Sequence, residues 1–405
     1  MRNSYVENVS KVYDSAADRL SEKQDLVFDV YAKLSSKSLR YLDKENIKNR
    51  ISRLLKNPLV EKALTEKGVA AEFRDFVDLN GLSEKANSEL ERVINGADFI
   101  PIWFLNRGSE LRRTVARVLV RVNGISSYGT GFLIGPGVLI TNCHVLDFTD
   151  VNGSPIKDNL AGVTVEFDYE ETFDGSMQKS ISFSLDPDSL LLQSAWHELD
   201  YVVVALQERS RDGAVTIDQL GYNRLAGDLG KIAKGEPVYI IQHPNGQPKQ
   251  VVLQNNRLID RSEDLPYLTY EADTDFGTSG SPVYNRQWEV VALHHSSEIA
   301  RDGLKNILAK DGSVWAPAMG SKSVKFLQLN EGIRISKILS NLSQKYSDFY
   351  RQIRKSGDQG EIYTSRGLGL LEITLRTHNG AQPVDLIAPI PIAKLNPTPK
   401  FSNPD

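Results

Sequence analysis

The pattern of apolar residues changes character near residue 96. Before that point apolar residues recur every three or four positions, for example at Val27, Val30 and Leu34, which is the period of an amphipathic helix. The same spacing returns twice before Asn95-Gly96, a pair typical of a helix end. The pattern therefore predicts a small helical bundle over residues 1–95.

From about residue 115 the pattern becomes one of short apolar runs separated by glycine turns, which is typical of strands. These runs cover 115–122, 131–134, 138–141, 163–167, 201–206, 238–242, 251–254, 267–271, 282–284 and 290–294. Because no helical pattern separates them, they favour antiparallel barrels or a sandwich over a sheet of βαβ units. A helix closes the region, with Ile335, Ile338, Leu339 and Leu342 on one face.

Four segments follow from this pattern. Residues 1–95 are a helical bundle, to which we assign a regulatory or targeting role. Residues 96–114 are an apolar connector, and residues 115–345 form the β domain with its closing helix. Residues 346–405 are an extension whose proline-rich end is expected to be partly extended or disordered.

Composition excludes several classes of protein. The net charge is −4 and no run of Lys and Arg carries interleaved aromatic residues, so neither nucleic acid nor a membrane is an expected partner. No stretch approaches the roughly 20 apolar residues of a membrane helix, and the N-terminus lacks the apolar core of a secretory signal. Cys143 is the single cysteine, which rules out an internal disulfide and favours a cytoplasmic location.

The strongest chemical signal is Gly277-Thr278-Ser279-Gly280, directly before a predicted strand. A serine between glycines can present its hydroxyl on a tight turn. The N–H groups of Gly277 and Ser279 can then converge on an oxyanion. Taken alone the motif is weak, because glycine–serine turns are common in loops.

Two further residues complete a candidate triad. His144 ends a Gly-x-Gly hairpin, and histidine titrates near neutrality, as a general base requires. Asp200 directly precedes the apolar run 201–206, where a buried carboxylate needs a partner. A hydrogen bond from the imidazole would satisfy it and fix the ring tautomer.

Other candidates are weaker. Cys143 adjoins His144, but adjacent side chains at a strand end point apart, so we assign it to the core. Ser281 and His243 are interpreted as structural. The six histidines show no ligand-like spacing with acidic residues, so neither a metal nor another cofactor is expected. An α/β-hydrolase esterase is excluded by chain order, since that class runs Ser, Asp, His.

Together the three blocks resemble the trypsin-like serine peptidases, and within them the V8-like glutamyl endopeptidase branch. The resemblance is carried by Thr-Asn-Cys-His144, by Leu-Asp200-Tyr-Val-Val-Val-Ala-Leu and by Gly-Thr-Ser279-Gly-Ser-Pro, and it covers residues 115–345. It implies a mainly β fold, a chymotrypsin-like double β-barrel with an N-terminal helical domain and a closing C-terminal helix. It also implies a catalytic triad of His144, Asp200 and Ser279. The aspartate that secreted trypsins carry before the nucleophile is replaced by Thr278.

The resemblance leaves the residue before the scissile bond open. Asp273 stands where the floor of the specificity pocket is commonly formed and would select Arg or Lys. Thr274 and His294 match the residues that bind glutamate in glutamyl endopeptidases, and a charge-assisted hydrogen bond from His294 would hold a carboxylate. We favour glutamate.

Two functions remain in view. The first is a serine endopeptidase that acts on a protein or peptide substrate through an acyl-enzyme, with a regulatory partner for the helical domain. The alternative is a catalytically silent scaffold that serves as a protein-binding module. The intact triad and oxyanion positions favour the enzyme.

Overall fold

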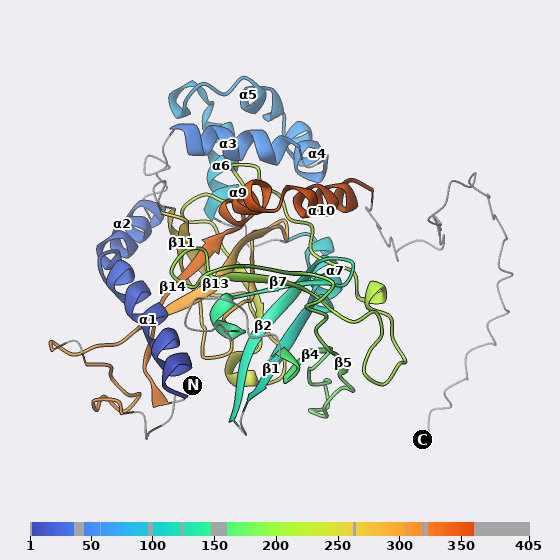
Figure 1. Cartoon of the computed structure of the whole chain (residues 1–405). Helices are drawn as coiled ribbons and strands as arrows, with labels where there is room; N and C mark the ends of the chain where they lie inside the picture. Colours follow the sequence, from blue (N-terminus) through green and yellow to red (C-terminus); the bar gives the residue numbers. More distant parts are fainter. Residues whose placement is uncertain are drawn as a thin grey trace, which may run out of the picture. The chain divides into compact units, whose positions relative to one another are not determined.

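The computed structural model describes residues 2–35, 44–56, 58–95, 100–122, 125–146, 160–261, 265–304, 306–316, 319 and 323–359. Two antiparallel sheets dominate it (Figure 1). Side chains on one face of a strand repeat every second residue, and in the first strand Ala116, Val118 and Val120 enter one core on that spacing.

The first sheet runs in the order β5-β4-β1-β2-β3-β7-β6. Its strands are β1 (Val115–Val122), β2 (Ile125–Gly135), β3 (Val138–Thr141), β4 (Val163–Phe167), β5 (Ile181–Phe183), β6 (Leu191–Ser194) and β7 (Tyr201–Ala205).

The second sheet runs in the order β10-β11-β14-β13-β12-β8-β9. Its strands are β8 (Tyr239–Gln242), β9 (Gln250–Val252), β10 (Arg257–Arg261), β11 (Tyr267–Glu271), β12 (Pro282–Tyr284), β13 (Val290–Ile299) and β14 (Phe326–Arg334). Strand β13 extends five residues beyond the predicted end at residue 294, and all ten of its residues are buried.

Three helices contribute to the core that joins the sheets, among them α10 (Ser347–Gln359) through Phe349. Helix α9 (Ile335–Lys345) buries the four apolar residues predicted to form its inner face. Helix α7 (Trp103–Arg112) lies within the predicted connector, and its Phe104 packs among the aromatic residues of that core. The Phe104 carbonyl also accepts a hydrogen bond from Trp288 Nε1 at 2.8 Å. This part of the connector is therefore a packed helix and belongs to the core.

The N-terminal helices form two groups. Helices α1 (Arg2–Ser21) and α2 (Gln24–Ser35) contact strands of the second sheet. The other group shares an apolar core of its own and comprises α3 (Lys44–Leu55), α4 (Pro58–Glu66), α5 (Ala70–Arg74), the 3-10 turn η2 (Leu79–Gly81) and α6 (Glu84–Asn95). The segment predicted as one bundle is thus helical but divided into two separately packed groups.

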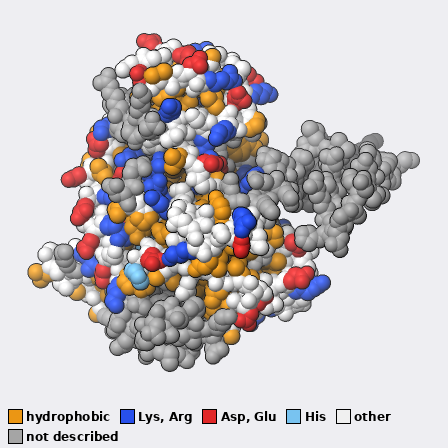
Figure 2. Space-filling view, turned by 45° about the horizontal axis from the view of Figure 1, so that its top comes forward, with side chains coloured by type: hydrophobic (Ala, Val, Ile, Leu, Met, Phe, Trp, Pro, Cys, Tyr) orange, Lys and Arg blue, Asp and Glu red, His pale blue; other side chains and the backbone are white. Residues whose placement is uncertain are grey.

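The mainly β, chymotrypsin-like fold with N-terminal helices and a closing helix is confirmed. Of the predicted C-terminal extension, residues 347–359 form helix α10 (Ser347–Gln359), and the proline-rich end lies outside the described residues. The segment boundaries at 95, 115 and 345 stay a prediction. Among the described helices, none combines the length and apolar character needed to cross a membrane. On the face seen in Figure 2, acidic and basic side chains are interspersed.

Candidate active site

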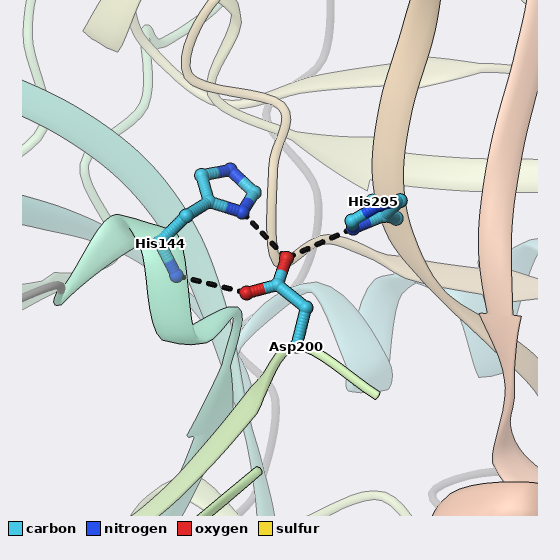
Figure 3. A group of neighbouring side chains, drawn as sticks. All are labelled: His144, Asp200 and His295. Carbon is cyan, nitrogen blue, oxygen red and sulfur yellow. Dashed lines mark hydrogen bonds and ion pairs between the residues drawn. The ribbon is translucent and has the colours of Figure 1, made fainter. Parts of the chain in front are cut away.

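His144 is positioned by strand β3 and by η3 (Cys143–Val145), the single 3-10 turn that follows it. The neighbours Cys143 and Val145 are both buried in the core of the first sheet, so the backbone is anchored on either side of the histidine. His144 itself is 4% exposed, and its ring faces the start of β7 (Figure 3).

Asp200 stands directly before β7 in the left-handed backbone region, with φ of 39°. Such a conformation costs a residue with a side chain about 1–2 kcal/mol. Two hydrogen bonds hold it, from Asp200 N to Ala195 O at 3.0 Å and from Asn142 Nδ2 to Asp200 O at 2.9 Å. The turn directs the carboxylate at His144, whose backbone N–H donates to Oδ1 at 2.9 Å.

The second carboxylate oxygen of Asp200 contacts two imidazoles (Figure 3). Oδ2 lies 2.6 Å from His144 Nδ1 and 2.8 Å from His295 Nδ1. Burial would raise the pKa of Asp200, but the two histidines more than offset it, and the pKa falls to about 2. Asp200 is therefore ionised at neutral pH and can only accept. Both Nδ1 atoms must then donate, which leaves His144 Nε2 as the nitrogen able to take a proton.

The Ser279 turn bridges the two sheets. It is flanked by Gly277 and Gly280, with φ of 89° and 87°, a region in which only glycine is unstrained. A Cβ on Gly280 would meet the carbonyl oxygen of Thr130 on β2 at 2.0 Å. Thr130 holds the turn twice, donating from N to Ser279 O at 2.9 Å and from Oγ1 to Gly277 O at 2.7 Å. The first sheet thus fixes the turn that the second sheet carries.

The N–H groups predicted to bind an oxyanion, those of Gly277 and Ser279, donate to no acceptor among the described residues. The carbonyl of Phe276 accepts from the backbone N–H of Asn245, and that of Gly277 accepts from Thr130. Ser279 is 6% exposed, and within the described part of the chain no hydrogen bond joins its hydroxyl to His144. Such bonds are often long before substrate binds.

Comparison with known proteins agrees with this geometry. Residues 129–293 match the family model of the trypsin-like peptidase domain. The match includes all three residues of the candidate triad and strands of both sheets. The matched residues make up less than half of the chain, and they support a trypsin-like peptidase domain at this position.

A curated relative extends the similarity beyond that domain. The uncharacterized protein y4fB of Sinorhizobium fredii (strain NBRC 101917 / NGR234) is 35% identical over 270 residues, which are 63% of this chain and 39% of the relative. The chain therefore spans about two fifths of the length of the relative it matches.

Solved structures give weaker similarity. The active form of the Rv3671c protease from M. tuberculosis is 16% identical, with a TM-score of 0.35, over 62% of this chain and 89% of that one. Deg5 is 14% identical, with a TM-score of 0.37, over 60% and 94% of the two chains. These values are too low to carry an argument about the site.

The predicted substrate-binding residues of the peptidase domain lie in different settings. The side chain of Asp273 is exposed, and its carbonyl accepts from Gln242 Nε2 at 3.0 Å. Thr274 Oγ1 is 2.7 Å from Ser297 Oγ and donates to Asn330 Oδ1 at 2.5 Å. The threonine hydroxyl therefore already belongs to a polar cluster that links β13 and β14.

His294 is buried on β13, with its Nδ1 at 2.7 Å from the hydroxyl of Tyr270. Burial, with a smaller contribution from His295 and His144, lowers the pKa of His294 to about 3. The imidazole is therefore neutral at neutral pH, whereas the sequence reasoning expected a charged donor. With the Tyr270 hydroxyl donating to Nδ1, the ring presents Nε2–H, a neutral donor.

Sequence reasoning missed His295, which adds the second imidazole to Asp200, and Glu331, whose Oε1 lies 3.6 Å from His295 Nε2. The predicted strand ended at His294, so His295 was not assigned to the site. The adjacent pair of histidines was the available signal, because successive side chains of a strand face opposite ways. His294 contacts the hydroxyl of Tyr270, and His295 contacts Asp200 of the triad.

A metal ion does not fit between these groups as they are arranged. His144, Asp200 and His295 offer ligand atoms within 4.8 Å of one another. Both nitrogens, however, approach the same oxygen at 2.6 and 2.8 Å, which are hydrogen-bond distances. Ligands about 2.0–2.2 Å from a tetrahedral zinc ion lie farther apart than that.

The remaining candidates have structural settings. Cys143 is buried in the core of the first sheet. His243 is fully buried, with Nδ1 at 3.1 Å from Gln247 O, and burial followed by the charge of Lys249 lowers its pKa to about 3. Ser281 is also fully buried, and its hydroxyl has no partner among the described residues.

Proposed function

We propose that the chain is a serine endopeptidase that cleaves peptide bonds through an acyl-enzyme on Ser279. The observation that carries this is the coupling of two sheets at one point. The first sheet supplies an ionised Asp200 bonded to His144, and through Thr130 it also holds the turn of Ser279. A scaffold without catalysis would not require that arrangement.

The roles follow from the donor and acceptor pattern. Ser279 Oγ attacks the peptide carbonyl carbon while His144 Nε2 takes the hydroxyl proton. Asp200 stabilises the resulting imidazolium, and the N–H groups of Gly277 and Ser279 bind the oxyanion. His144 returns the proton to the leaving amine. Water then repeats the sequence on the ester and releases the second product.

A fluorophosphonate probe tests the nucleophile directly, since it labels only an activated serine. We expect labelling of the full chain and none of Ser279→Ala. Ser281→Ala is the matched control, because its hydroxyl lies two residues away and is fully buried. Equal labelling of wild type and Ser279→Ala, or none of either, would leave the binding-module alternative in place.

We further propose a preference for glutamate before the scissile bond, as in the V8-like branch that the motifs resemble. His294 supports it as a buried neutral donor. The Thr274 hydroxyl already donates to Asn330 and would have to exchange that bond for one to the glutamate carboxylate. Asp273 is exposed, which weakens the competing choice of Arg or Lys.

Peptides that differ only at this residue provide the test, with His294→Ala and Asp273→Asn measured alongside. We expect cleavage after Glu to be favoured, and His294→Ala to remove most of that preference. Cleavage after Arg or Lys that is lost in Asp273→Asn would assign the specificity to Asp273 instead.

A further inference from the structure

We propose that His295 is a positioning residue for Asp200, and that Arg19 of helix α1 holds it in place through Glu331. The inference builds on the proposed function, because it concerns the alignment of the same triad. It gives the N-terminal helix a part in the chemistry, whereas the sequence assigned that region only regulation or targeting.

Every link in this chain of residues is a direct contact. Arg19 donates to Glu331 in a bidentate pair, from Nε to Oε2 at 2.8 Å and from its terminal nitrogen to Oε1 at 2.6 Å. Glu331 Oε1 is 3.6 Å from His295 Nε2, and His295 Nδ1 is 2.8 Å from Asp200 Oδ2. The path therefore runs from a helix outside the matched domain to the carboxylate that orients His144.

Burial makes these contacts consequential. The side chains of Asp200, Glu331 and His295 are 1%, 2% and 3% exposed. Buried carboxylates need charge partners or hydrogen bonds, since water cannot solvate them. His295 lies between two of them. Arg19 supplies the positive charge for Glu331, so that this carboxylate does not compete with Asp200 for the imidazole.

The ring of Tyr267 contacts both His295 and Arg19. Tyr267 stacks on His295, with the ring planes at 17° and the centroids 5.7 Å apart, and the Arg19 guanidinium lies 4.4 Å from the Tyr267 centroid. Burial, with Glu331, raises the pKa of Tyr267 to about 12, so it is uncharged at neutral pH. The ring thus packs against the imidazole and also binds the cation through its face.

The position of His295 matters because it shares an acceptor with the general base. His144 Nδ1 and His295 Nδ1 approach the same oxygen, Asp200 Oδ2. A displacement of His295 therefore rotates the carboxylate and with it His144. Misplacement of a catalytic group by about 1 Å can cost about 100-fold in rate, so a smaller rotation is expected to cost about tenfold.

The chain offers a matched control for the helix attachment. Arg50 of α3 forms a similar bidentate pair with Glu236, at 2.6 and 2.7 Å, and both side chains are 1% exposed. This pair also joins an N-terminal helix to the rest of the fold, yet neither residue contacts the triad. Arg50→Met therefore measures the effect of losing a buried ion pair that has no connection to Asp200.

The experiment compares kcat and KM on a fluorogenic peptide in the full chain. We expect Arg19→Met to lower kcat about tenfold with KM within about threefold, and Arg19→Lys to recover part of the loss. Arg50→Met should lower the denaturation midpoint at least as much as Arg19→Met does, while its kcat stays within about twofold of wild type. Equal kcat losses in Arg19→Met and Arg50→Met would overturn the proposal.

Two substitutions of His295 separate its two contacts. In His295→Asn the amide nitrogen can take the place of Nδ1 on Asp200, and in His295→Gln it can take the place of Nε2 near Glu331. We expect Asn to lose about as much kcat as Arg19→Met, because it too lacks the contact with Glu331, and Gln to lose more, because it lacks the contact with Asp200. Adding Arg19→Met should have no further effect in His295→Asn, since the connection is already cut. The opposite order of Asn and Gln would contradict the proposed role.

A measurement without turnover keeps the inference separate from the proposed function. In Ser279→Ala protein, low-field proton NMR detects the imidazole Nδ1–H groups bonded to Asp200. Arg19→Met should shift these signals and Arg50→Met should not. Absent fluorophosphonate labelling of wild type would defeat the proposed function alone. Signals unmoved by Arg19→Met would defeat the positioning role, whether or not the protein is a peptidase.

Discussion

The two groups of N-terminal helices are attached to the fold in different ways. Helix α1 contacts β13, β14 and η3, the elements that carry His295, Glu331 and His144, and α2 contacts β10. The apolar contacts of α1 place Ala16 and Leu20 near Ile259 and Leu329, and Tyr13 near Ile299. Ion pairs of Arg19 and Asp14 add to them.

Helices α3 to α6 have instead a core of their own. Ile47, Phe73 and Leu90 pack together there, and Ala233 is the one residue of that cluster from the rest of the fold. The group is fastened by the buried pair of Arg50 and Glu236, away from the triad. On the role proposed for Arg19, the first attachment serves the chemistry and the second serves stability, although both belong to the same helical segment of sequence.

The largest loss of kcat is expected from a substitution in the triad itself, and losses from substitutions in α1 are compared with it. Asp200→Asn should lower kcat about 10,000-fold, because the amide no longer fixes the tautomer of His144. The measurement is kcat of the purified variant, with circular dichroism to show that it is folded. No substitution in α1 is expected to reach that loss, and one that did would make the helix more than a positioning element.

One buried leucine in each helix group tests whether the packing of that group affects kcat. Leu20 on α1 and Leu90 on α6 are both buried, so Leu20→Ala and Leu90→Ala should each cost about 2–5 kcal/mol of unfolding free energy. We expect only Leu20→Ala to lower kcat as well, because it loosens the helix that carries Arg19. A fall of kcat in both variants, measured on fully folded protein, would break the distinction.

Acid should destabilise the fold by protonating Asp200, the carboxylate to which the contacts of α1 lead. Its pKa is lowered in the folded protein from 3.8 to about 2, so its ionised form stabilises the fold above pH 4. That stabilisation, about 2 kcal/mol, is lost as the pH falls from about 4 to 2. Denaturant titrations across this range should show the loss in wild type and less of it in Asp200→Asn. An identical pH dependence of the unfolding free energy in wild type and Asp200→Asn would contradict a lowered pKa of Asp200.

The smallest effect concerns an ion pair at the edge of α1. Asp14 pairs with Arg301, and its side chain is half exposed. Such pairs contribute about 0.2–1 kcal/mol, so Asp14→Asn should leave stability and kcat close to wild type. Loss of activity here would mean that the docking of α1 depends on its surface charges as well as on Leu20 and Arg19.

The fold and the candidate triad were largely predictable from sequence. The three motif blocks lie on strands and turns whose apolar runs are long enough to recognise, such as β1 and β7. Strands β5, β6, β10 and β14 were missed because all of them are partly polar, and β5 and β6 are also short. Their place in the sheets depends on pairing with neighbours, which local pattern does not show.

The second contact on Asp200 could not be found by the same reasoning. Strand β13 continues through His295 and three polar residues to Ile299, all of them buried, while a polar run ordinarily indicates exposure. Its burial depends on β14 and on helix α1, which come from distant parts of the chain. Arg19 and Glu331 are 312 positions apart in the sequence. The spacing of apolar residues is a local pattern and gives no information about such distant pairs.

The bonds from Thr130 to the Ser279 turn have a consequence for folding during synthesis. The hydrogen bond from Thr130 to Gly277 joins residues 147 positions apart, so the turn cannot take its final geometry until both sheets are made and docked. During synthesis the ribosome releases the triad in the order His144, Asp200, Ser279, with β13 and β14 still to come. The proposed nucleophile therefore reaches its final geometry only after the whole β domain has folded.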